Sequence, residues 1–200
     1  MLEYKWEKEY RAKGYSLICG VDEAGRGCLC GPVCAAAAIL PEDWNHPLLN
    51  DSKKLTPKRR DQLFDEIVAN AVAYSIGWAS VEEIDELNIL NAAMLAMRRA
   101  IEGLPQKADF ALVDGNVVRD FPIPAVAIVG GDGASPSIAA ASILAKVSRD
   151  RLCEELDAQY PEYKIAVHKG YGTKVHREAL LAYGPSPCHR KTFLKKILGE

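Results

Sequence analysis

The sequence predicts a three-layer α/β domain, in which helices cover both faces of a central sheet. Short apolar runs bounded by glycine, which are typical of buried strands, alternate with stretches of helical periodicity along the first two-thirds of the chain. A length of 200 residues, of which 48% are hydrophobic and 26% charged, suits one globular domain with a modest helical appendage. We therefore expect a main domain over residues 1–160 and a basic helical segment over residues 161–200 that packs on it.

Five apolar runs are expected to form the strands. The first two, residues 16–21 and 32–40, are separated only by a glycine-rich stretch, so they are expected to pair as an antiparallel hairpin. The other three are expected at residues 73–79, 110–113 and 125–129.

Capping residues mark the helices between these strands. Thr56 and Pro57 begin a helix that runs to about residue 70, and residues 80–83 form a capping box that opens a short helix. Asn88 caps the next helix, which Gly103 ends. A long helix follows over about residues 137–159, and then a basic loop and two helical segments divided by residues 184–187.

Composition excludes several classes of protein. No stretch reaches the apolar length of a membrane span, and residues 1–13 are charged without an apolar signal core, so we expect a cytoplasmic protein. The six cysteines form no CxxC pair and no zinc-binding spacing. Cys28, Cys30 and Cys34 cluster, but small buried thiols are common in packed interiors, so we assign them no chemistry.

Charge is unevenly distributed along a chain of net charge −2. Residues 61–102 hold eight acidic residues and two arginines, whereas residues 164–196 hold eight lysines or arginines and one acid, Glu178. Three of the four histidines also lie in this last segment. The basic segment fits either a phosphate-binding surface or a solvated helical face, and charge alone does not separate the two.

Four carboxylates follow the ends of predicted strands. Asp22 and Glu23 follow the first, Asp114 the fourth and Asp132 the fifth, each beside or near glycine. One such residue usually marks only a turn, but several at one edge of a sheet would surround a single point with oxygen ligands. Hard divalent cations such as magnesium prefer these ligands, and a pair of ions so held can hydrolyse a phosphodiester.

Asp22 and Glu23 are neighbours in the chain, which limits how both can line one site. Adjacent side chains on a regular strand point to opposite faces, so Asp22 and Glu23 are expected to share a site only if the strand bends or ends between them. Gly20, Gly25 and Gly27 make such a break plausible.

The glycines of this segment do not have the spacing of a dinucleotide-binding loop, since the next glycine is Gly31 and a proline follows it. Instead, residues 25–27 expose backbone near the carboxylates, where peptide groups can hydrogen-bond a sugar 2′-hydroxyl and Arg26 can hold a phosphate.

These motifs resemble the ribonuclease HII family. The resemblance rests on five ordered blocks between about residues 15 and 195: residues 20–33, 51–55, 113–115, 139–146 and 168–173. It implies an RNase H-like fold with a mixed five-stranded sheet and a C-terminal helical part. It also implies endonucleolytic cleavage of the RNA strand of RNA–DNA hybrids. Duplex DNA with embedded ribonucleotides is expected to be cut on the 5′ side of the ribonucleotide, leaving 3′-hydroxyl and 5′-phosphate ends.

The resemblance also assigns roles to residues. It implies Mg²⁺ or Mn²⁺ as cofactor, with Asp22, Glu23, Asp114 and Asp132 as catalytic metal ligands. The ribose-reading motif falls on Gly25, Arg26 and Gly27, and the tyrosine that packs on the neighbouring deoxyribose falls on Tyr171. Three further residues are expected near substrate phosphates: Lys53, Ser142 and Lys146.

Alternatives remain at several points. Asp150 competes with Asp132 for the fourth acidic place, but between Arg149 and Arg151 it is expected to form exposed ion pairs. His168 and His176 are expected at the surface. A non-catalytic hybrid-binding module and a DNA nuclease of similar fold are the competing functions. The family commonly has proline and a small residue at the positions of Cys28 and Cys30. Since the motifs begin at residue 20, we expect no extra N-terminal domain of the ribonuclease HIII type, and we expect a monomer.

Overall fold

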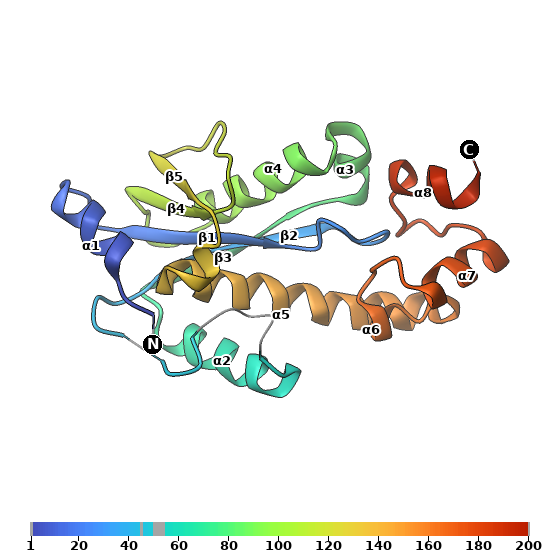
Figure 1. The fold of residues 1–200 in the computed structure, drawn as a ribbon, viewed down its shortest axis with the longest axis horizontal. Helices are drawn as coiled ribbons and strands as arrows, with labels where there is room; N and C mark the ends of the chain where they lie inside the picture. The colour runs from blue at the N-terminus through green and yellow to red at the C-terminus, as the bar shows by residue number, and fades with distance from the viewer. Residues whose placement is uncertain (1, 45, 50–54, 200) are drawn as a thin grey trace.

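The computed structural model describes residues 2–44, 46–49 and 55–199. A five-stranded sheet of order β3-β2-β1-β4-β5 lies between two layers of helices (Figure 1). The strands are β1 (Ile18–Ala24), β2 (Val33–Ile39), β3 (Ala73–Ala79), β4 (Phe110–Asp114) and β5 (Ala125–Ile128). The first three pair antiparallel and the last two run parallel to β1, so the predicted mixed sheet is confirmed.

Two helices cover one face of the sheet. They are α3 (Val81–Leu87) and α4 (Ile89–Glu102), and the apolar side of α4 packs on alternate residues of β1, β2 and β4. The predicted caps are present: Ser80 forms a full capping box, and the Asn88 side chain accepts from the amides of Leu90 and Asn91. Helix α4 therefore begins directly after Asn88 and ends directly before Gly103, as predicted.

The long helix α5 (Pro136–Gln159) covers the other face, and α2 (Pro57–Asn70) packs on its outer side (Figure 1). Gly20 explains how closely α5 approaches β1, because a Cβ atom at this position would lie 2.0 Å from the backbone carbon of Ser137. The glycine is thus required for helix–strand contact and not for a bend of the strand.

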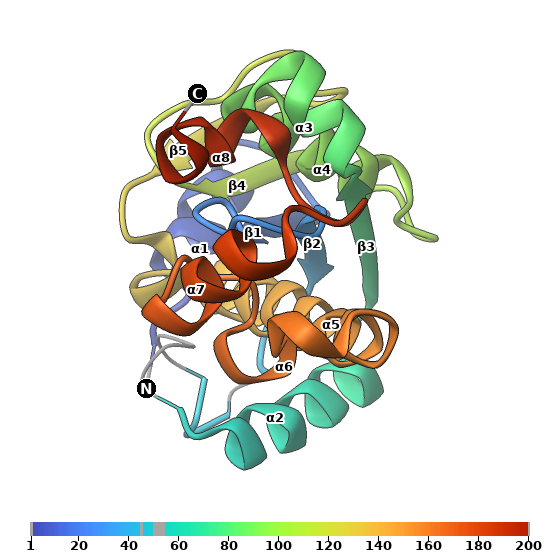
Figure 2. The same cartoon turned by 90° about the vertical axis from the view of Figure 1, so that its right-hand side faces the viewer.

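The C-terminal part gathers at one end of the sheet, beside the last turns of α5 (Figure 2). It consists of η3 (Pro161–Tyr163), α6 (Ile165–His168), α7 (Lys174–Tyr183) and α8 (Lys191–Leu198). Its apolar residues form a cluster with Leu29 and Cys30, which belong to the loop between β1 and β2. Packing between distant segments therefore fixes this loop against the C-terminal part.

The N-terminal helix was not predicted from the sequence. Helix α1 (Lys5–Ala12) packs its Tyr10 ring on Phe110 of β4, with ring centroids 4.1 Å apart. Trp6 and Tyr10 lie one turn apart on it, but a helix of eight residues is too short to be stable alone, so its packing on β4 stabilises it. Within the described residues, no helix is both long and apolar enough to cross a membrane.

Candidate active site

Three of the four predicted carboxylates line one pocket of about 240 Å³ at the carboxyl ends of β1 and β4. Asp22 and Glu23 come from β1, and Asp114 is the last residue of β4. Because β1 and β4 are parallel and Val21 pairs with Val113, Asp22 and Asp114 follow adjacent positions of the sheet. The other lining residues are Ala24, Gly25, Arg26, Gly27, Ser142, Lys146 and Tyr171.

The expected break between Asp22 and Glu23 is absent. Strand β1 continues to Ala24, and its antiparallel pairing with β2 is regular through both acids. The pairing of β1 with β4, in contrast, ends at Val21, so both acids lie beyond that ladder at the mouth of the pocket. Asp22 and Glu23 therefore share the pocket without a break in β1. The pocket lies at the end of the sheet, where side chains from both faces of the strand line it.

Burial and mutual repulsion disfavour the charged form of Asp22. Its side chain lies beneath the pocket with only 6% of its surface exposed. Burial raises its pKa well above the usual range, and the negative charges of Glu23 and Asp114 raise it further. A hydrogen bond from Ser142 on α5 and another of 2.7 Å from the amide of Glu23 act in the opposite direction.

Glu23 has a cationic partner within the pocket. Arg26 Nη1 donates to Glu23 Oε1 at 3.1 Å, and this contact lowers the pKa of Glu23, although burial raises it by more. The nearby charge of Asp114 also raises it. Three carboxylates that repel one another are the donor set that a hard divalent cation neutralises, so the residues present fit such an ion.

Asp132 has a different position. It lies in the single turn η2 (Gly131–Gly133), is 9% exposed, and is not among the residues that line the pocket. Its neighbour Gly131 donates its amide to Asp114 Oδ1 at 2.7 Å, so the turn is anchored to the pocket through the backbone. The fourth predicted ligand therefore adjoins the cluster without lining the pocket.

Two buried arginines shape the loop that carries residues 25–27. Arg190 donates to the carbonyl oxygens of Gly31, Arg26 and Gly25 at 2.8, 3.0 and 2.8 Å. Arg149 packs against Gly25 so tightly that a Cβ there would lie 1.9 Å from its Nε. Gly25 also has a φ of +97°, a conformation that favours glycine, whereas Gly20 and Gly27 do not.

Tyr171 lies beside this loop with 46% of its surface exposed, in agreement with the expected exposed aromatic. The two segments run side by side, because the amide of Leu29 donates to the carbonyl of Gly170 at 2.8 Å and Cys28 bridges Tyr171. The ring is therefore held next to residues 25–27, at the edge of the pocket.

Ser142 and Lys146, one turn apart on α5, also line the pocket, whereas Lys53 lies outside the described residues. Lys146 Nζ forms an ion pair of 2.7 Å with Asp150. Asp150 also contacts Arg60 of α2 at 3.4 Å, so its partners are Lys146 and Arg60 and not its chain neighbours. Successive helical residues point in different directions, which separates Asp150 from Arg149 and Arg151.

Comparison with known proteins decides the family. The family model described as "Ribonuclease HII" matches residues 19–196. The chain belongs to the ribonuclease HII family.

Individual relatives agree along almost the whole chain. A ribonuclease HII from Caldicellulosiruptor saccharolyticus is 51% identical over 98% of this chain and 95% of its own length. One from Verminephrobacter eiseniae is 57% identical over 88% of this chain and 85% of its own length. The crystal structure of ribonuclease H2 from Pyrococcus horikoshii OT3 superposes with a TM-score of 0.75 at 28% identity, covering 92% of this chain and 98% of that one.

Membership of the ribonuclease HII family confirms the predicted fold and the predicted class of enzyme, a metal-dependent ribonuclease H that acts as an endonuclease. The non-catalytic binding module and the DNA nuclease are thereby set aside.

In this member of the ribonuclease HII family, six of the eight basic residues of the C-terminal segment are exposed, and two have other surroundings. Arg190 is fully buried and holds backbone, and Lys169 forms an ion pair of 3.1 Å with Glu154. His168 and His176, expected at the surface, are 8% and 0% exposed, because α6 and α7 fold onto the end of α5 and turn both rings inward.

Arg149 and Arg190, which hold the loop of residues 25–27 in place, were not identified from the sequence. Arg149 follows the helical spacing of buried α5 residues such as Ser142 and Ala145, which is the one local signal that it faces inward. Arg190 lies in a turn before α8, where no periodicity indicates which way a side chain points.

Proposed function

We propose that this enzyme hydrolyses the RNA strand of RNA–DNA hybrids and incises duplex DNA on the 5′ side of an embedded ribonucleotide, leaving 3′-hydroxyl and 5′-phosphate ends. The observation that carries the proposal is one pocket in which Asp22, Glu23 and Asp114 adjoin both residues 25–27 and Tyr171. Groups able to hold a metal ion and groups able to contact a nucleotide sugar thus share a single cavity.

Asp22, Glu23 and Asp114 are the proposed metal ligands, with Asp132 as the fourth acidic residue beside them. The mutual repulsion that raises the pKa of Asp22 favours binding of Mg²⁺ or Mn²⁺, since a divalent cation removes its cause. A pair of such ions, when bound, supplies an activated water and stabilises the leaving oxygen of a phosphodiester. Ser142 keeps Asp22 oriented through its hydrogen bond.

Residues 25–27 are proposed to distinguish ribose from deoxyribose. Arg190 fixes the carbonyls of Gly25 and Arg26, so the peptide groups of this loop are held in one arrangement before substrate binds. A preformed set of peptide donors and acceptors can hydrogen-bond a 2′-hydroxyl, which DNA lacks. Arg26 and Lys146 are proposed to contact phosphates beside the cut, and Lys53 keeps the same proposed role.

Tyr171 is proposed to pack against the deoxyribose that adjoins the ribonucleotide. Its exposed ring lies next to the glycine loop, and flat aromatic faces stabilise nucleotide units by contact that does not depend on sequence. We further infer that the enzyme acts as a monomer. Light scattering in solution tests that inference.

Cleavage of defined duplexes tests the proposal. The enzyme is incubated with a DNA duplex that carries one ribonucleotide, with an all-DNA duplex of the same sequence and with an RNA–DNA hybrid, in magnesium, manganese or EDTA. We expect cleavage of the first and third substrates with metal only, at the 5′ side of the ribonucleotide. Equal cleavage of the all-DNA duplex would contradict ribose recognition.

The metal-binding role is tested by Asp114→Asn, with the exposed Asp65→Asn of α2 as matched control. Asp114→Asn is expected to lower turnover by several orders of magnitude while duplex binding largely survives, because the ligand is lost and the side-chain size is kept. Turnover near that of Asp65→Asn would remove Asp114 from the proposed ligands.

A further inference from the structure

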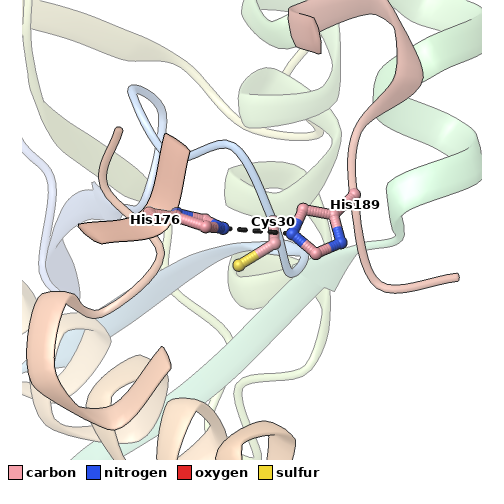
Figure 3. Close-up of side chains that lie close together, drawn as sticks. All are labelled: Cys30, His176 and His189. Carbon is pink, nitrogen blue, oxygen red and sulfur yellow. Dashed lines mark hydrogen bonds between the residues drawn. The ribbon is translucent and has the colours of Figure 1, made fainter. Parts of the chain in front are cut away.

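A second group of potential metal ligands lies among the C-terminal helices. Cys30 comes from the loop between β1 and β2, His176 from α7 and His189 from the turn before α8 (Figure 3). The Cys30 sulfur and one ring nitrogen of each histidine lie within 4.8 Å of one another, and all three side chains are buried. None of these residues lines the carboxylate pocket. We propose that Cys30, His176 and His189 form a Zn²⁺ site that is separate from the catalytic metal site.

The spacing of the donor atoms suits a tetrahedral ion. His176 Nε2 and His189 Nε2 are 3.0 Å apart. Two nitrogens bound to zinc at about 2.0–2.1 Å in a tetrahedral arrangement are separated by about 3.3 Å, so the rings need to separate only slightly. Three ligands drawn from three segments converge on one point, where Figure 3 places the Cys30 sulfur beside the two facing rings.

His176 is already oriented as a zinc ligand. Its Nδ1 lies 3.0 Å from the carbonyl oxygen of Tyr171, to which it donates, and this leaves Nε2 as the nitrogen that faces the cluster. A histidine that binds metal commonly donates its other ring N–H to a backbone carbonyl in this way.

His189 requires one proton to move. Its Nδ1 accepts from the amide of Ser186 at 3.1 Å, so without metal its proton is on Nε2 and is donated to His176. When zinc takes Nε2, that proton moves to Nδ1, which gives up its bond from the Ser186 amide and donates instead to the Ser186 hydroxyl oxygen 2.9 Å away. The Cys30 thiol releases its proton to solvent, so binding of one zinc ion releases one proton from these three ligands.

Cys188 lies beside this group but is not one of its three members. Its sulfur exchanges a hydrogen bond with the Cys30 thiol and lies 3.7 Å from His189 Nδ1. One thiolate and two imidazoles, with a water at the fourth position, form a set that selects zinc over magnesium because a soft sulfur donor suits zinc and magnesium prefers oxygen.

The site would join the active-site loop to the C-terminal segment. Cys30 is next to Gly31, and His189 is next to Arg190, which binds the carbonyl of Gly31. Zinc bound between Cys30 and His189 would therefore cross-link the two segments at the point where Arg190 shapes residues 25–27. The expected effect is on stability, and the proposal does not depend on the proposed substrate.

Cobalt and zinc titrations test the site. Reduced, metal-free protein in excess Mg²⁺, which occupies the carboxylate pocket, is titrated with Co²⁺ and the visible and near-ultraviolet spectra are recorded. We expect one equivalent of Co²⁺ to give the intense bands of a tetrahedral site together with thiolate charge transfer, and Zn²⁺ to displace it. Stoichiometric Zn²⁺ is also expected to raise the melting temperature by several degrees.

The variants Cys30→Ser and Cys30→Ala are expected to lose both the charge-transfer band and the zinc-dependent rise in melting temperature. Cys153→Ala, at another buried free cysteine of the same cluster, is the matched control and is expected to keep both. Using two variants at Cys30, with circular dichroism on each, separates loss of the ligand from loss of the fold. Absence of the band in the unaltered protein, or its persistence in folded Cys30→Ser, would overturn the proposal.

Discussion

The Nη2 atom of Arg190 donates a hydrogen bond of 2.8 Å to the carbonyl oxygen of Gly25, a residue 165 positions earlier in the chain. Both partners are buried, so the bond is shielded from water. Because the same guanidinium also binds the carbonyls of Arg26 and Gly31, one side chain near the C-terminus fixes the loop of the predicted ribose-reading motif.

Arg190→Lys is expected to destabilise the protein by about 2–4 kcal/mol, because an ammonium group cannot reproduce three bonds made by a planar guanidinium. Urea denaturation measures the free energy of unfolding. If residues 25–27 read ribose, the variant also discriminates less between ribonucleotide-containing and all-DNA duplexes. Arg177→Lys, at an exposed position of α7, is the control and is expected to change stability by less than about 0.5 kcal/mol. Equal stability of the two variants would contradict this account of Arg190.

Gly25→Ala is expected to be more harmful than Gly14→Ala. The two glycines have nearly the same φ, +97° and +99°, so both variants carry the strain of a left-handed backbone, about 1–2 kcal/mol. Only at Gly25 does the added Cβ also meet Arg149, at 1.9 Å, whereas nothing lies within 4 Å at Gly14. Melting temperature and cleavage rate together measure the difference. Similar losses in both variants would show that the contact with Arg149 is unimportant.

Asp22→Asn is expected to stabilise the metal-free protein at neutral pH while it abolishes cleavage. The pKa of Asp22 is raised in the folded state, so between its unfolded and folded pKa values the folded protein binds more protons. Stability therefore rises as pH falls through that interval and is lowest at higher pH, where the repelling carboxylates are charged. Each unit of pKa shift corresponds to about 1.4 kcal/mol.

Thermal unfolding in EDTA at several pH values, compared with Asp65→Asn, measures this contribution. The unaltered protein and Asp65→Asn are expected to gain stability on mild acidification from neutral pH, and Asp22→Asn to gain less. Magnesium or manganese is expected to stabilise the first two more than Asp22→Asn. A pH dependence unchanged by Asp22→Asn would show that Asp22 does not carry the repulsion.

Tyr171→Ala is expected to weaken binding of a ribonucleotide-containing duplex by about 1–3 kcal/mol, the typical contribution of one aromatic contact with a nucleotide. Tyr171→Phe keeps the ring and is expected to bind nearly as well as the unaltered protein. Tyr183→Ala removes another exposed tyrosine, on α7 and 65% exposed, and controls for loss of surface aromatic area. Fluorescence anisotropy with a labelled duplex measures the three affinities. Normal binding by Tyr171→Ala would exclude the contact.

Local sequence determined most of the elements and the positions of the acids. Apolar runs, capping residues and glycines locate β2, β3, α2, α4 and α5 to within one or two residues, because strand and helix periodicity and helix caps depend on near neighbours. The same reasoning placed Asp22, Glu23 and Asp114 at strand ends, where parallel neighbours bring side chains together.

Tertiary structure alone decided how the site is built. Only packing shows that β1 stays regular through Asp22 and Glu23, that Asp132 lies beside the pocket, and that Arg190 turns inward from a mostly exposed basic segment. The same packing buries His176 and His189 against Cys30. The physical reason is that local sequence fixes the backbone pattern, whereas the burial of a charged or polar side chain depends on which distant groups satisfy its hydrogen bonds.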